Sequence, residues 1–145
     1  MSSKKRIDKP LGEILVDREV ITKDQLEKAL LEQKKDGGLI GDTIVKLGFA
    51  QEEDIAHCLS LQYGFPYLPL ENYEIPKEVV NVIPKAVAEH YCIIPIDKMD
   101  NMLTVAMADP LNIHAIEDIE EITGCEIQIF VSTSSDVRKS IDLFF

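Results

Sequence analysis

Residues 10–33, PLGEILVDREVITKDQLEKALLEQ, and residues 39–62, LIGDTIVKLGFAQEEDIAHCLSLQ, are two copies of one pattern. A shift of 29 positions places Gly12 on Gly41 and keeps apolar positions on apolar positions. Such self-similarity indicates one supersecondary unit that has been copied. Two copies are too few for a solenoid, so the pattern predicts a pair of helical hairpins packed on each other.

The first copy contains clear signals for two helices. Pro10 suits the first turn of a short helix, because its missing N–H is not needed there. Thr22, followed three residues later by Gln25, forms a capping box that starts a longer helix, which is predicted to end near Asp36. The second copy repeats the arrangement with Gln51 as a poorer cap.

The chain changes character after the second copy. Three prolines and alternating aromatic residues in residues 64–76 forbid a long helix and predict an extended, packed connector. Two short proline-opened helices follow, and from Cys92 the apolar period becomes two. The expected elements are strands 92–97 and 102–108 separated by the turn 98–101, a helix 112–123, a strand 126–132 and a final helix from 134 or 135 to about 143. In the helix 112–123, we expect one side to carry Ile113, Ile116, Ile119 and Ile122.

The predicted fold is α+β, with an N-terminal helical repeat of two helix hairpins followed by a small three-stranded α/β module with helices on one face. The expected organisation is a helical repeat subdomain in residues 1–63, a proline-rich connector in residues 64–76 and a small α/β subdomain in residues 77–145.

Composition narrows the functional classes. The net charge of -11 argues against a DNA or RNA surface, which needs a basic stripe. No apolar run approaches the ~20 residues of a membrane span, and no signal peptide is present, so we expect a cytoplasmic protein without direct membrane insertion. The cysteines Cys58, Cys92 and Cys125 are widely spaced and suit a reducing compartment. No Cys-x-x-Cys or His-x-x-x-His spacing indicates a metal site.

Signatures of catalysis are also missing from the sequence. It contains no phosphate-binding Gly-x-x-x-x-Gly-Lys-Ser/Thr loop, no Gly-x-Gly-x-x-Gly and no Gly-x-Ser-x-Gly. We therefore expect no catalytic residues in this chain.

The glutamines and glycines that recur in register have two interpretations each. Gln33 and Gln62 either satisfy backbone groups at the end of a helix or contact a ligand that has two similar halves. Gly12 and Gly41 either allow close helix packing or leave backbone N–H groups at a helix start open to an anion.

The two blocks resemble the paired motif at the N-terminus of type II secretion and type IV pilus assembly ATPases. Each block has 24 residues, and the five residues KKDGG separate them. The phrases QYGFPYLPL, AVAEHYCIIPI and LTVAMADPLN are also typical of these proteins, so the resemblance covers nearly the whole chain. It implies a non-catalytic regulatory or docking domain that precedes an ATPase motor in the same full-length protein. The implied partner is the cytoplasmic part of an inner-membrane secretion or pilus component, which would hold the protein peripherally at that membrane.

In members of this family the paired motif binds cyclic di-GMP, and this implies an alternative function as a receptor for that dinucleotide. The family pattern opens each block with Arg, where this chain has Pro10 and Leu39, and it has a midway Gly, present as Gly48 but replaced by Glu19 in the first block. The resemblance therefore implies weakened binding, with no other cofactor. By matching positions, the candidate ligand residues are Leu11, Gly12, Leu26, Leu30, Gln33, Ile40, Gly41, Gly48, Ile55, Leu59 and Gln62.

Overall fold

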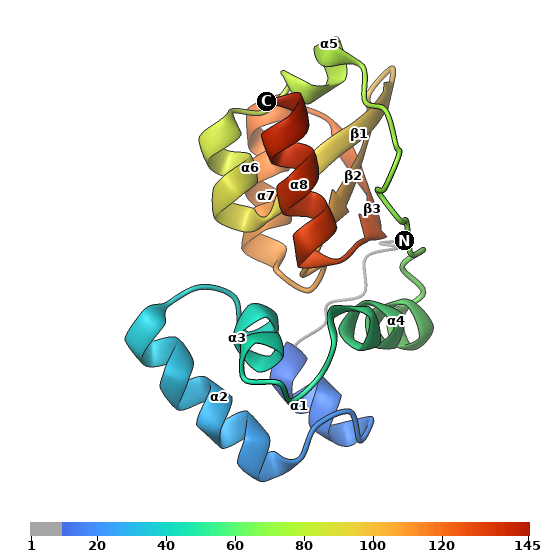
Figure 1. Ribbon diagram of the computed structural model, residues 1–145. Helices are drawn as coiled ribbons and strands as arrows, with labels where there is room; N and C mark the ends of the chain where they lie inside the picture. Colours follow the sequence, from blue (N-terminus) through green and yellow to red (C-terminus); the bar gives the residue numbers. More distant parts are fainter. Residues whose placement is uncertain (1–9) are drawn as a thin grey trace. The chain divides into compact units, whose positions relative to one another are not determined.

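The computed structural model describes residues 10–145, apart from the side chain of Gln62. The chain divides into two compact units, one up to Ile55 and one from Ala56 onward (Figure 1). The division falls inside the fourth helix. The domain boundaries expected from the sequence, at residues 63 and 76, stay a prediction.

The helical unit repeats its helix starts with the period seen in the sequence. The elements are α1 (Leu11–Asp17), α2 (Lys23–Asp36), α3 (Ile40–Lys46) and the start of α4 (Glu52–Tyr63), which continues into the second unit. The first residues of α1 and α3, and those of α2 and α4, are each 29 positions apart. Thr22 and Gln25 form the predicted capping box at the start of α2. Pro10 is the N-cap of α1 rather than a residue of its first turn.

Apolar residues at helical spacing form the core of this unit. Leu15 and Ile44, which occupy equivalent places in the two blocks, are fully buried. Leu11, one turn before Leu15, is also buried, whereas Ile40, one turn before Ile44, is half-buried. The buried residues of α1, of the connection after it and of α2 are Leu11, Ile14, Leu15, Ile21 and Ala29.

The turn that ends the short helix of each block uses a left-handed backbone. Gly48 has φ +79°, and its counterpart Glu19 has φ +62°. A residue with a Cβ is strained in this region by ~1–3 kcal/mol, whereas glycine is not. The first block therefore carries a strained residue where the second has glycine.

We expect Glu19→Gly to raise the free energy of unfolding of the helical unit by roughly 0.5–1 kcal/mol, because relief of strain is partly offset by the greater freedom of glycine in the unfolded chain. Gly48→Ala is the matched control and should lower it by about 1 kcal/mol or more. Urea unfolding of the two variants measures both changes. A destabilised Glu19→Gly variant would show that the Glu19 side chain makes a contact worth more than the strain.

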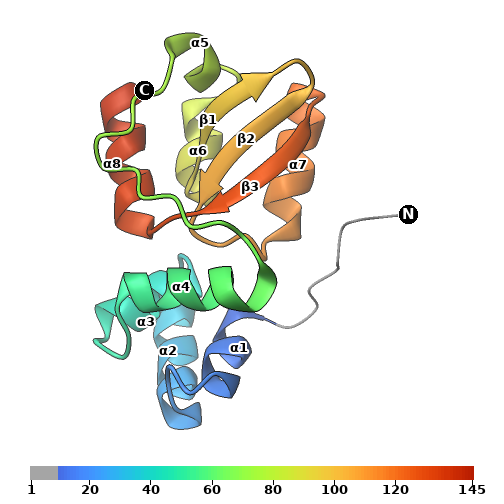
Figure 2. The ribbon, with the colours of Figure 1, turned by 90° about the vertical axis from the view of Figure 1, so that its right-hand side faces the viewer.

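The α/β unit contains a three-stranded sheet in the order β1-β2-β3. Strands β1 and β2 are antiparallel, whereas β2 and β3 are parallel and joined through α7. Figure 2 shows α6, α7 and α8 on the same face of this sheet, as predicted. The elements are α5 (Lys77–Val80), α6 (Lys85–Tyr91), β1 (Ile93–Met99), β2 (Met102–Met107), α7 (Ile113–Thr123), β3 (Glu126–Val131) and α8 (Ser134–Phe144).

One row of side chains across the sheet forms the centre of this core. Ile93 pairs with Met107, Met107 pairs with Val131, and all three are fully buried. Leu103 and Val105 lie on the same face of the central strand and are also fully buried. The apolar period of two therefore identifies the helix-covered face correctly.

The turn between β1 and β2 is tighter than predicted. Strand β1 continues to Met99 and β2 begins at Met102, so that only two residues form the turn. Asp100 takes a left-handed φ of +53°, and its carbonyl accepts a hydrogen bond of 2.9 Å from Lys98 Nζ. Exposed polar residues can thus continue the hydrogen-bonded pairing of two strands. The alternation of apolar residues does not predict this extension of the strands.

The isoleucines of α7 do not lie on one side, and that expectation was wrong. Ile119 is fully buried, but Ile113 and Ile122 are 38% and 47% exposed. Residues at successive i+3 positions drift by about 60° per step around a helix of 3.6 residues per turn. Ile113 and Ile122 therefore end on opposite sides of α7, and Ala115 supplies the second fully buried position.

The connector is hydrogen-bonded to the end of β3. The Val131 N–H donates to Pro66 O at 2.8 Å, and the Leu68 N–H donates to Val131 O at 2.9 Å. Tyr67 accordingly pairs with Val131 in a parallel bridge. The extended segment near Tyr67 is thus part of the second unit and runs along the outer edge of β3.

Candidate functional site

The helix starts that open the two blocks lie together. Leu11 Cδ2 is 3.6 Å from the position that a Cβ atom would take at Gly41, and Ile55 Cδ1 is 3.9 Å from it. Pro10 and Leu39 are the N-caps of α1 and α3, and neither helix has a side-chain cap. Pro10 and Leu39 therefore precede two neighbouring helix starts.

The two repeated glycines have different surroundings. A Cβ atom at Gly12 would overlap the end of the Leu26 side chain, which would have to move, so close packing favours glycine here. At Gly41 the nearest atoms are at ordinary contact distance, and a methyl group would fit. Packing therefore does not require Gly41, which leaves the access of a ligand to the backbone as the alternative.

The Gln33 side chain has a partner within its own turn. Its Nε2 donates a hydrogen bond of 2.8 Å to Gly38 O, and this bond stabilises the loop that follows α2. This contact supports the interpretation of Gln33 as an amide that satisfies backbone groups at a helix end. Gln62 does not allow the same comparison, because its side chain lies outside the described part of the chain.

The remaining predicted ligand residues differ in accessibility. Leu26 is half-buried and Leu30 is 44% exposed on α2, so both offer apolar surface. Ile40 is half-buried and Gly48 is exposed. Leu59 is fully buried in the second unit and offers no accessible surface.

One of the basic side chains near the junction of the blocks forms an ion pair, and others are exposed. Lys46 Nζ lies 3.1 Å from Asp36 Oδ2. Hydrogen bonding to Glu32, together with this ammonium group, lowers the pKa of the Asp36 carboxyl group. Lys34 and Lys35 lie in the last turn of α2 and are exposed. Lys9, which also lies near a block end in the sequence, is outside the described residues.

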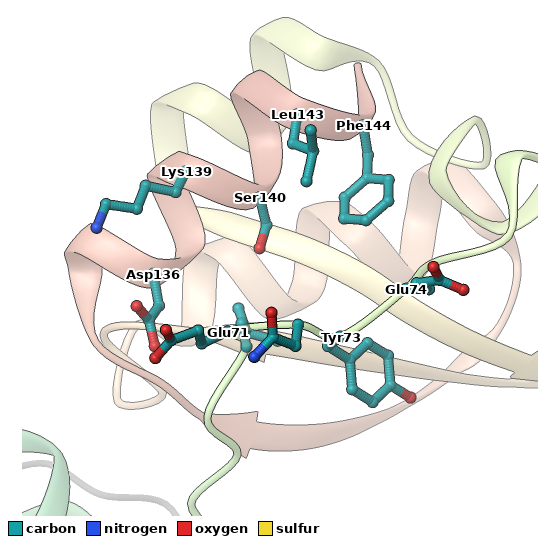
Figure 3. Close-up of a pocket in the computed structure, with 10 residues that line it drawn as sticks. Glu71, Tyr73, Glu74, Asp136, Lys139, Ser140, Leu143 and Phe144 are labelled. Carbon is teal, nitrogen blue, oxygen red and sulfur yellow. The ribbon is translucent and has the colours of Figure 1, made fainter.

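Sequence reasoning missed a groove in the second unit. It has a volume of about 680 Å³ and lies between connector residues 70–74 and α8 (Figure 3). The two walls are some sixty residues apart in the sequence, so no local motif identifies it. Within residues 10–145, no group of three His, Cys, Asp or Glu side chains is placed to hold a metal ion, and no helix is long and apolar enough to cross a membrane.

Comparison with known families matches the second unit. The model of the MshEN domain matches residues 63–145, which include the connector, the sheet and the helices that cover it. The two blocks, residues 10–33 and 39–62, lie outside this matched range.

Known proteins match nearly the whole chain. The type IV pilus assembly ATPase PilB of Myxococcus xanthus is 36% identical over 135 residues, which are 93% of this chain and 24% of PilB. The structure of MshE with cyclic di-GMP has a TM-score of 0.72 and 26% identity, and the match covers 94% of this chain and 99% of that one. The N-terminal domain of XpsE has a TM-score of 0.79 at 20% identity, with 100% and 99% of the two chains covered, and shows the same fold. The chain thus spans about a quarter of the length of the PilB that it matches.

Proposed function

Because the chain belongs to the family of MshEN domains, the N-terminal domains of type II secretion and type IV pilus assembly ATPases, we propose that it is a non-catalytic regulatory and docking domain. It would link the binding of a partner or ligand to a C-terminal ATPase motor in the same full-length protein. The match to PilB, which covers almost all of this chain but only 24% of PilB, carries this proposal.

In this docking role, the proposed partner is the cytoplasmic part of an inner-membrane component of the secretion or pilus machine. Such a partner would hold the protein peripherally at the membrane without any membrane-spanning helix of its own. Binding can regulate a motor only if the partner binds one motor state more tightly than another.

Titration with purified partners tests the docking role. We expect at least one cytoplasmic domain of the cognate inner-membrane components to bind this chain saturably in calorimetry. The affinity should fall as salt is raised, because a chain of net charge -11 presents an acidic surface. Absence of binding by every component of the machine would overturn docking.

A second function is favoured by the likeness to MshE, whose structure contains cyclic di-GMP. The neighbouring helix starts of α1 and α3 and the accessible side chain of Leu30 support a dinucleotide site on the two blocks. Leu30 offers apolar surface for a guanine base, and the backbone N–H groups at the helix starts can hold a phosphate. Calorimetry of the chain with cyclic di-GMP tests this function.

A further inference from the structure

The groove between residues 70–74 and α8 carries an excess of negative charge. Glu71 and Glu74 come from the connector, and Asp136 comes from the first turn of α8. Among residues 10–145 none of these three carboxylates forms an ion pair, and Lys139 is the one cation of the lining. Figure 3 shows Asp136 and Glu71 toward one end of the groove and Glu74 toward the other. Unpaired carboxylates spread along a groove favour a ligand with more than one positive charge.

A serine hydroxyl group also lies in the lining of the groove. Ser140 is 6% exposed. In Figure 3 its oxygen atom points from α8 into the groove. The hydroxyl group is accessible from the groove, so it can form a hydrogen bond with a ligand that binds there.

Apolar side chains at the end of α8 complete the lining. Leu143 is 75% exposed, and Phe144 is half-buried. Tyr73, from the connector, adds an aromatic ring to the same groove. Interfaces are enriched in aromatic anchors surrounded by polar groups. The groove therefore combines acidic, hydrogen-bonding and apolar contacts, as a surface that binds a protein segment does.

We propose that this groove docks a short basic segment of a partner protein. Lysine or arginine side chains of the segment pair with Glu71, Glu74 and Asp136, its backbone bonds to the Ser140 hydroxyl, and an apolar side chain covers Leu143. The inference rests on the docking role proposed above and names the surface and chemistry of that docking. Charge complementarity selects the occupant, since an acidic segment or a nucleic acid would be repelled.

The test uses the full chain and a fluorescent probe peptide of sequence KLRKFR. The groove variant combines Glu71→Gln, Glu74→Gln and Asp136→Asn. Its control combines three exposed carboxylate substitutions outside the groove, Glu89→Gln, Glu121→Gln and Glu126→Gln, and has the same net charge. We expect the groove variant to bind the probe about tenfold more weakly than the natural chain and the control to stay within about threefold. Ser140→Ala, which removes only the hydroxyl group, should weaken binding by about threefold.

Chemical-shift mapping locates the probe. Shifts confined to residues 70–74 and 136–144 support the inference, whereas an equal loss of affinity in the groove variant and its control overturns it. A dimer of this chain that the groove variant abolishes would also overturn it, because the occupant would then be a second copy. If purified inner-membrane components bind the groove variant as tightly as the natural chain, the groove inference fails while docking stands. If none binds either protein, the docking role itself fails.

Discussion

The Pro10→Arg, Leu39→Arg double variant is expected to bind cyclic di-GMP about 10²- to 10⁴-fold more tightly than the natural chain. The ligand is a dianion, and this chain has a net charge of -11, so long-range attraction is absent. Each charge-assisted hydrogen bond from arginine contributes roughly 1.5–3 kcal/mol, and two such bonds account for the expected ratio if their effects add. We therefore expect weak binding, or none, by the natural chain.

The geometry of the helix starts supports this expectation. Pro10 and Leu39 cap α1 and α3, whose first turns lie together where Leu11 meets Gly41. Two arginines at these positions would reach one common region. Lysines at the same positions should restore less affinity, since an ammonium group lacks the planar fork of a guanidinium group.

Calorimetry measures the difference in affinity for cyclic di-GMP between the natural chain and the double variant. The control is a variant with two arginines at other positions. Met99→Arg and Ile122→Arg place the same charge at exposed positions of the second unit and should leave the affinity within a fewfold of the natural value. If the natural chain binds as tightly as the double variant, the missing arginines do not matter. If neither binds and both are folded, the repeat serves packing and docking alone.

The elements that the sequence predicts well are those with local signals. Thr22 and Gln25 mark the start of α2 by a contact between residues three apart, and Asn112 and Thr133 cap α7 and α8 in a similar way. The fully buried face of β2 follows from alternation alone. These features depend on neighbours in the chain, so the sequence contains them directly.

Local sequence signals do not predict features that depend on contacts between distant residues or on an unusual backbone conformation. Gly12 and Gly41 are equivalent in the sequence, yet only the three-dimensional structure shows that the first lies against the Leu26 side chain. Glu19 has a left-handed backbone conformation, which glutamate rarely adopts, so its residue type does not indicate the turn. The acidic groove lies between the connector and α8, which are far apart in the sequence, so no local motif predicts it.

The division of the chain into two units predicts that a core substitution in one unit leaves the other folded. Leu15 and Leu103 are fully buried, the first in α1 and the second in the central strand β2. Replacing either by alanine should lower the free energy of unfolding of its own unit by about 3–4 kcal/mol, from lost apolar contact and the cavity left behind. Leu31→Ala and Leu61→Ala, at leucines that are 62% and 80% exposed, are controls for the two units and should change it by less than about 0.5 kcal/mol.

Hydrogen exchange resolves the effect by region. In Leu15→Ala the amides of α1 to α3 should exchange faster, by about two to three orders of magnitude where global opening of that unit governs exchange, while those of β1 to β3 keep their protection. In Leu103→Ala the pattern should be reversed. Helix α4 contains the division between the units, so its amides report whether the boundary lies there or after residue 63, as the sequence suggests. Faster exchange across the whole chain in both variants would mean that the two units unfold as one, because a single cooperative transition exposes every amide together.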